Sequence, residues 1–194
     1  MRIIRMSELV EIPWKNGGGI TRNIAADMQG DRVSWRLSMA DVSVEGPFSE
    51  FAGLTRVLTV IEGTGMVLET PEGALAADYA QPVTFDGATP VNARLTAGPL
   101  RDFNLMYDTQ GWQGEVTVLH GPGERESAGA DLLVLHCIAG QVGLPGGETL
   151  GKGDTAILED APTQARLDQG DIMLRIALQR RGQTEASNSA MAPR

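Results

Sequence analysis

The chain has 194 residues, enough for one large domain or two small ones, and it is 42% hydrophobic and 21% charged, like an ordinary globular protein. Its formal net charge of −9 argues against a nucleic-acid binder, and its apolar runs fall far short of the roughly 20 residues that span a membrane. The single cysteine, Cys137, excludes an internal disulfide, and the first eight residues contain no apolar segment of signal-peptide length. We therefore expect a cytoplasmic protein with no nucleic-acid or membrane partner.

Only two histidines are present, His120 and His136, and both lie in the second half of the chain. Histidine is the commonest ligand of catalytic zinc, iron and copper. A site with several histidine ligands close in sequence cannot be built from two, so we expect no metal and no other cofactor.

Short strand-like runs, separated by turn signals, follow one another along the chain. The 24 glycines and 10 prolines mark the turns. A short helical turn is expected within residues 7–13, and no long amphipathic helix is found. The expected strands are 33–40, 57–61, 65–68, 103–107, 116–119, 132–138 and 172–178. This pattern predicts an all-β fold, a sandwich or a barrel.

The first unusual segment is the loop 13–22, which contains Trp14, Lys15 and Asn16 followed by three glycines. Ordering three glycines costs backbone entropy, so such a run indicates a positive φ or a close approach of the backbone to another group. One interpretation is a loop whose tryptophan, lysine and asparagine face a ligand. The other is a flexible surface turn.

Residues 33–39 alternate strictly, with Trp35 on the apolar face and Arg36 on the opposite, polar face. If Trp35 packs outward against a second layer, Arg36 points into the barrel. If Trp35 fills the barrel, Arg36 is solvated. The alternation alone does not choose between these arrangements.

Four other residues, later in the chain, could form a polar cluster beside an aromatic ring. Phe48 precedes Arg56, and Asp102 and Asn104 share one face of a later strand. An arginine paired with Asp102, beside an asparagine amide, could bind a carboxylate or an amide. An ordinary structural ion pair would use the same residues.

A weak internal repeat indicates two similar barrels in tandem. Residues 57–63 align with 134–140, residues 93–95 with 165–167, and residues 102–106 with 171–175. We expect an N-terminal barrel over 1–112 that carries the ligand pocket and a structural barrel over 113–181, with strands able to exchange between the two. Residues 121–129 are expected to form a linker or long surface loop, and 182–194 a disordered tail.

The two halves differ in chemistry, because all nine aromatic residues lie at or before Trp112. In the repeat, Arg56 aligns with Leu133, and Asn104 aligns with Met173. A barrel interior that holds arginine and asparagine is not built for packing alone, since a buried charge is costly unless it is paired. The first barrel would then carry the site, although a bulkier core would also explain the aromatic residues.

Four segments together resemble the HutD/Ves family: 14–22, 35–40, 46–56 and 102–106. The resemblance covers about residues 5 to 107. It implies a cupin fold with two barrels in one chain and a regulatory association with bacterial histidine utilisation. The usual metal ligands of cupins, His-x-His with a later Glu and His, are replaced near 47–56 by Phe, Ser and Arg, and near 102–104 by Asp and Asn.

The leading hypothesis is a metal-free bicupin that binds a small anionic metabolite, with the histidine-degradation intermediates urocanate and N-formylglutamate as candidates. Two alternatives stay open. One is a metal-independent isomerase or lyase that uses Asp102 and Lys15 as acid and base. The other is an interaction module, a homodimer joined through a sheet edge, which predicts no buried polar pocket. The expected ligand-binding residues are Trp14, Lys15, Asn16, Trp35, Arg36, Phe48, Arg56, Asp102 and Asn104.

Overall fold

The computed structural model describes residues 1–159 and 162–182, so the expected tail lies almost entirely outside the described residues. Within them the fold is all-β, as predicted, with only two short 3₁₀ turns, η1 (Met6–Glu8) and η2 (Pro145–Gly147). The expected helical turn is η1. No helix in this part of the chain is long and apolar enough to cross a membrane.

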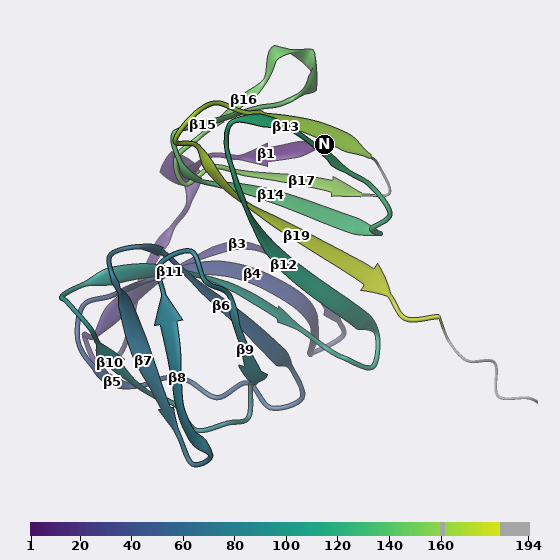
Figure 1. Ribbon diagram of the computed structural model, residues 1–194. Coiled ribbons are helices and arrows are strands. Elements are labelled where there is room, and N and C mark those ends of the chain that lie inside the picture. Colours follow the sequence, from purple (N-terminus) through teal and green to yellow (C-terminus); the bar gives the residue numbers. More distant parts are fainter. Residues whose placement is uncertain (160–161, 183–194) are drawn as a thin grey trace, which may run out of the picture.

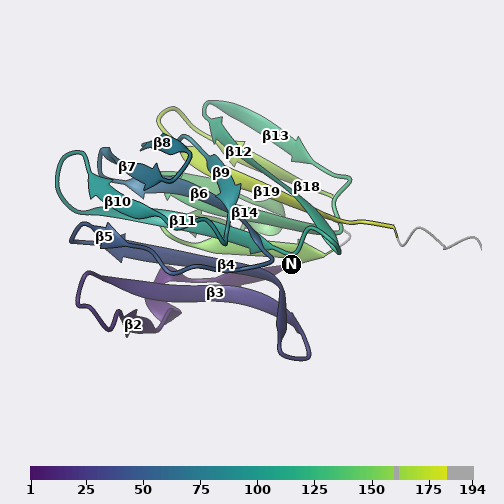
Figure 2. The same cartoon turned by 90° about the horizontal axis from the view of Figure 1, so that it is seen from below.

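The first barrel consists of two antiparallel sheets, seen in the lower part of Figure 1. The six-stranded sheet has the order β2 (Glu11–Pro13), β3 (Gly19–Gln29), β4 (Arg32–Val42), β11 (Leu100–Tyr107), β6 (Thr55–Glu62) and β9 (Val83–Asp86). The four-stranded sheet has the order β5 (Gly46–Pro47), β10 (Asn92–Leu95), β7 (Gly65–Thr70) and β8 (Gly73–Asp78). Figure 2 shows β2, β3, β4 and β11 in succession across the larger sheet.

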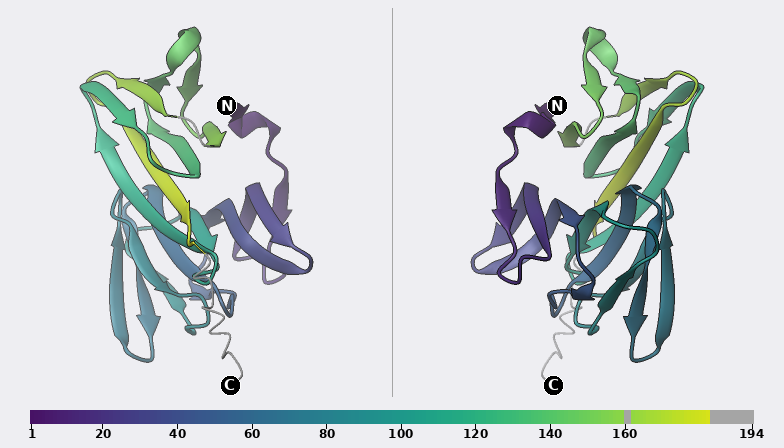
Figure 3. Two further views of the ribbon diagram at one scale, coloured as in Figure 1. Left: turned by 90° about the vertical axis from the view of Figure 1, so that its right-hand side faces the viewer. Right: turned by 90° about the vertical axis from the view of Figure 1, so that its left-hand side faces the viewer.

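The second barrel repeats this arrangement with a five-stranded and a four-stranded sheet. The larger has the order β1 (Arg2–Ile4), β17 (Thr155–Glu159), β14 (Leu132–Ala139), β19 (Ile172–Arg180) and β12 (Trp112–His120). The smaller has the order β13 (Gly123–Ser127), β18 (Thr163–Leu167), β15 (Gln141–Gly143) and β16 (Thr149–Gly151). Figure 3 shows the N-terminal segment beside these strands before it descends to the first barrel.

The prediction of a loop at 121–129 is wrong. Residues 123–127 form β13, which pairs with β18 along its whole length. This strand lies at the edge of its sheet and alternates between half-buried and exposed residues, so no apolar run marks it in the sequence.

The internal repeat is visible in the sheet order. The run β9-β6-β11-β4 corresponds to β17-β14-β19-β12, and β5-β10-β7-β8 corresponds to β13-β18-β15-β16. The irregular step in pairing skips Ile61 in β6 and Ile138 in β14, and Arg56 and Leu133 each lie five residues before it, so they are counterparts as predicted.

The predicted match of Asn104 with Met173 is wrong by two residues. Asn104 lies opposite Leu58, and the corresponding Leu135 lies opposite Arg175. Met173 is therefore the counterpart of Asp102. Each sheet contains an irregular step in pairing near this point, which a comparison of two short apolar segments cannot detect.

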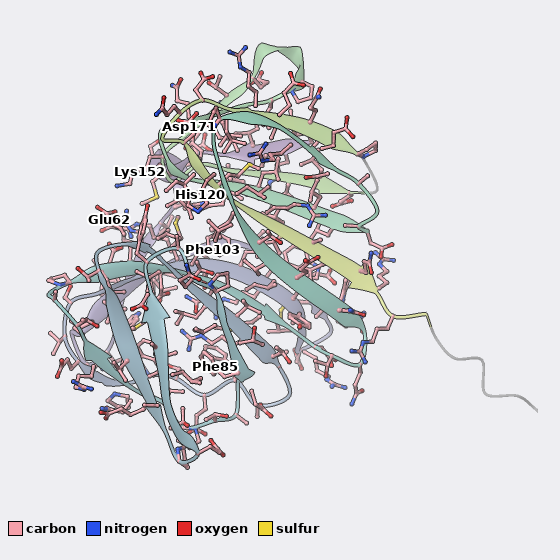
Figure 4. All side chains as sticks on the ribbon, in the orientation of Figure 1. Glu62, Phe85, Phe103, His120, Lys152 and Asp171 are labelled. Atoms are coloured by element: carbon pink, nitrogen blue, oxygen red, sulfur yellow. The ribbon has the colours of Figure 1, made fainter. Side chains whose placement is uncertain are left out.

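The two larger sheets pack face to face and form a core between the barrels, called here the inter-barrel core. Its members include Leu37, Met39, Val57, Phe103, Leu105, Val134, Leu174, Ile176 and Leu178. Trp35 packs against this core, so the alternation directs Arg36 into the first barrel. Figure 4 shows Phe103 at the boundary between the barrels.

The barrel interiors differ in the way the aromatic count suggested. The first holds apolar residues such as Leu58 and Leu68, with Trp14, Phe48 and Phe85 partly buried against them. The second is packed with aliphatic and sulfur-containing side chains. The counterpart of Asn104, Arg175, is half-buried, and its Nε donates to Ser127 Oγ at 3.2 Å.

Candidate functional site

One end of the first barrel opens into a cavity of about 580 Å³. Seven of the nine expected site residues line it: Trp14, Lys15, Asn16, Arg36, Phe48, Arg56 and Asn104. Trp35 does not, because it lies on the face of β4 that packs against the second barrel. Asp102 lies deeper in the barrel and is also absent from the lining.

The sheet register places the two arginines of the cavity in one row. Arg36 of β4 and Arg56 of β6 lie on either side of Met106 of β11, and Phe85 of β9 follows Arg56 in the same row. Two strand spacings separate the arginine backbones by roughly 10 Å. Their side chains therefore bring two positive charges to one wall of the cavity.

Arg56 is held from three sides, with only 6% of the residue exposed. Its Nε donates a hydrogen bond to Asn104 Oδ1 at 2.8 Å, and its guanidinium lies 4.9 Å from the Phe48 ring centre and 5.4 Å from that of Phe85. Burial lowers the pKa of the guanidinium, nearby Asp102 raises it, and Arg36 lowers it further. No carboxylate of a described residue lies within salt-bridge distance of Arg56, so its charge has no direct partner.

Asn104 connects Arg56 to a buried carboxyl. Its Nδ2 donates a hydrogen bond to Asp102 Oδ1, while Asp102 Oδ2 has no hydrogen-bond partner among the described residues. Asp102 is completely buried, and this burial raises its pKa to about 6, against the opposing effects of Arg56 and the Asn104 hydrogen bond.

Arg36 likewise has a neutral partner. Its Nε donates to Asn23 Oδ1 at 3.1 Å, its Nη2 donates to the same oxygen, and its guanidinium lies 5.8 Å from the Phe51 ring centre. Burial lowers the pKa of this guanidinium. An asparagine fixes each arginine without neutralising it.

The loop between β2 and β3 forms another wall of the cavity. Trp14 Nε1 donates to Thr21 Oγ1 at 2.8 Å, and the Trp14 ring meets Phe48 edge-on at 6.1 Å. A Cβ on Gly19 would lie 2.3 Å from a backbone oxygen of β4 and 3.1 Å from the Trp14 ring, so a glycine is required to seat the tryptophan. The loop is thus a packed part of the wall, with Lys15 exposed at its rim.

Asn16 has a structural role in the same loop. Its Oδ1 accepts a hydrogen bond from the Gly18 backbone N–H at 3.0 Å, which closes the turn, and Gly17 has a φ of 70°. Part of the hydrogen-bonding capacity of Asn16 is therefore used within the loop.

The charged residues that line the cavity are all positive. Lys15, Arg36 and Arg56 line the cavity, and no acidic residue of the described part of the chain does. This positive lining lies in a chain of net charge −9. The nearby acidic groups Glu11 and Asp41 are paired with Arg22, and Asp41 also binds Arg101.

Sequence reasoning missed the three residues that support the arginines: Asn23, Phe51 and Phe85. Phe85 is a cross-strand neighbour of Arg56, which only the β6–β9 register shows. The interaction-module alternative predicted no buried polar pocket, and the cavity with Arg56 and Asn104 differs from that expectation; dimerisation through a sheet edge stays a prediction. The proposed acid–base pair is not brought together, because Lys15 lies at the rim and Asp102 lies outside the lining. Among the described residues no cluster of His, Cys, Asp or Glu could hold a metal ion.

Two jelly-roll barrels in one chain, one of them hollow, define a bicupin. The chain belongs to the HutD family, whose model matches residues 6–174. An uncharacterised 21.2 kDa protein in the hutC 3′ region of Pseudomonas putida is 36% identical over 139 residues, which are 69% of this chain and 72% of the relative. Protein Ves of Escherichia fergusonii is 33% identical over 54% of this chain and 56% of its own length.

Solved structures agree with this assignment. HutD from Pseudomonas fluorescens SBW25 has a TM-score of 0.82 at 35% identity and covers 93% of this chain and 99% of its own. A conserved protein of unknown function from Pseudomonas aeruginosa PAO1 has a TM-score of 0.83 at 31% identity, covering 92% and 98%. The bacterial pirin YhhW of Escherichia coli, solved with nickel(II), shares the cupin-type fold at 9% identity, with a TM-score of 0.67 over 91% of this chain and 97% of its own.

Proposed function

We propose that the first barrel binds a small carboxylate metabolite, with urocanate and N-formylglutamate as the candidates, and that this binding serves the regulation of histidine utilisation. The association with histidine utilisation rests on family membership and on the relative from the hutC region. Ligand binding rests on the geometry of the cavity.

The observation that carries the proposal is the environment of Arg56. A guanidinium that is almost completely buried, positioned by a neutral amide and flanked by two aromatic rings, is costly to keep without an anion. The Nη atoms of Arg56 donate no hydrogen bond to any described residue, so they are available to a carboxylate, which guanidinium groups bind in a bidentate manner. The aromatic walls suit a small, largely flat body.

The test is calorimetric titration and thermal unfolding of the protein with urocanate, N-formylglutamate and, as a comparison that lacks a carboxylate, imidazole. A ligand at about 100 times its Kd should stabilise the protein by about 2.7 kcal/mol. Arg56→Gln should weaken binding of the acids at least about tenfold, because it removes the charge-assisted pair. Arg94→Gln is the matched control, since Arg94 lies outside the cavity and pairs with Glu69. Wild-type protein that binds neither acid at millimolar concentration would contradict the proposal.

A further inference from the structure

Asp102 is a carboxyl group buried next to the cavity with no evident packing reason. Its counterpart in the second barrel is Met173, so this position of the fold can be filled by an apolar side chain. Asp102 does not contact Arg56 directly. Asn104 lies between them, accepting from Arg56 and donating to Asp102 Oδ1.

We propose that Asp102 is an internal counter-charge of Arg56 and that a bound carboxylate displaces it in this role, so that anion binding is coupled to the uptake of one proton by Asp102. This inference rests on the proposed function and extends it. In the empty cavity the ionised Asp102 balances part of the arginine charge through Asn104. When the ligand's carboxylate pairs with Arg56, two negative charges share one cation.

The geometry allows the proton to resolve this conflict. Asp102 Oδ2 has no partner, so it can be protonated without breaking the Asn104 hydrogen bond to Oδ1. The charged groups that act on Asp102 are Arg56 of β6, which favours its ionised form, and Asp41 of β4, which opposes it. The smaller sheet contributes aliphatic side chains such as Leu68 and Ala93 to this interior, and none of the buried polar or charged residues of the described chain lies on its strands.

Electrostatics, like the hydrogen-bond geometry, favour protonation of Asp102 when a carboxylate binds. Burial already raises the pKa of Asp102 to about 6. A second carboxylate near Arg56 raises it further, since a like charge in a poorly solvated site disfavours ionisation. The proposal thus requires a carboxyl that is mostly ionised near pH 7 in the free protein and mostly protonated in the complex.

The experiment measures proton uptake on binding. The wild-type chain is titrated at pH 7 with urocanate and with N-formylglutamate, in buffers of different ionisation enthalpy. We expect uptake of more than half a proton per ligand, and an affinity that falls by up to about tenfold per pH unit between pH 6 and 8.

Asp102→Asn should abolish the uptake and raise the affinity at pH 8 severalfold above that of the wild type. Glu69→Gln, at an exposed position outside the cavity, should leave both unchanged. Binding without uptake by the wild type would overturn this inference alone. So would weaker binding by Asp102→Asn at every pH, which would make Asp102 a positioning residue. No binding of either acid at any pH would overturn the proposed function and this inference with it.

Discussion

Individual buried polar residues distinguish the two barrels more sharply than their backbones do. Arg56 occupies a position that a leucine fills in the second barrel, and Asp102 one that a methionine fills. The sequence identified both residues as candidates, because charged residues in apolar strands stand out. It could not place Trp35, because the direction of that side chain depends on the sheet of the second barrel that packs against it.

The buried carboxyl makes a prediction about stability. The folded-state pKa of Asp102, about 6, lies above its ordinary value of 3.8. The folded state therefore binds more protons than the unfolded state between these values, and stability falls as pH rises through 6. Asp102→Asn should remove this loss and gain up to about 3 kcal/mol relative to the wild type between pH 4 and pH 8.

Urea unfolding at the two pH values measures this gain. Asp168→Asn, whose side chain is 77% exposed, is the control and should show no such change. A difference between Asp102→Asn and the wild type that is the same at both pH values would contradict the assignment.

At the level of elements, the cavity depends on how one loop is fixed between β2 and β3. The sequence marked this loop by its three glycines. The reason for Gly19, close approach to β4 and to the Trp14 ring, required the folded sheet. The strand β13 was missed for a related reason, since an edge strand with polar, charged residues has the composition of a loop.

Gly19→Ala should therefore move Trp14 and distort the cavity wall. We expect a loss of carboxylate affinity of about tenfold or more, because the added methyl group would lie 2.3 Å from the Asp41 backbone oxygen, so the β3–β4 pairing beside the loop has to shift; circular dichroism checks that the fold is retained. Gly111→Ala is the matched control, since a Cβ there meets no atom within 4 Å. Equal affinities for the two variants, measured by titration calorimetry, would show that the loop has no part in binding.

The whole molecule is joined through the inter-barrel core. Phe103 of the first barrel packs against the His136 ring of the second, with ring centres 4.8 Å apart. Glu62 and Lys152 approach across the same boundary, with Oε1 and Nζ 3.4 Å apart (Figure 4). The aromatic count predicted two unequal barrels. No sequence pattern indicated that the barrels contact each other through the outer faces of their larger sheets.

His136 should make this junction sensitive to acid. Burial lowers its pKa to about 3, and its Nδ1 lies 2.9 Å from Thr155 Oγ1, so the ring is held neutral. Below its ordinary pKa of about 6.5 the unfolded state binds a proton that the folded state does not, so the contribution of His136 to stability decreases as the pH falls, opposite in sign to the contribution of Asp102. The slope is roughly 1.4 kcal/mol per pH unit.

His136→Gln should abolish this component between pH 6.5 and 4, as measured by urea unfolding. The exposed His120 provides the control, because His120→Gln should leave the wild-type slope unchanged. A stability difference between His136→Gln and the wild type that does not change between pH 6.5 and 4 would assign the acid sensitivity to another group.

The course of β1 bears on how this protein is made. Arg2–Ile4 are translated long before Thr155–Ile157, the residues of β17 with which they pair. The hydrogen bonds of Arg5 and Met6 to Asp154 likewise form only after Asp154 has been translated. During that interval β1 has no sheet partner, although β2 and β3, which flank the cavity loop, have already been translated. The chain that leads into the cavity wall can be anchored to the second barrel only after residues 154–157 have been translated.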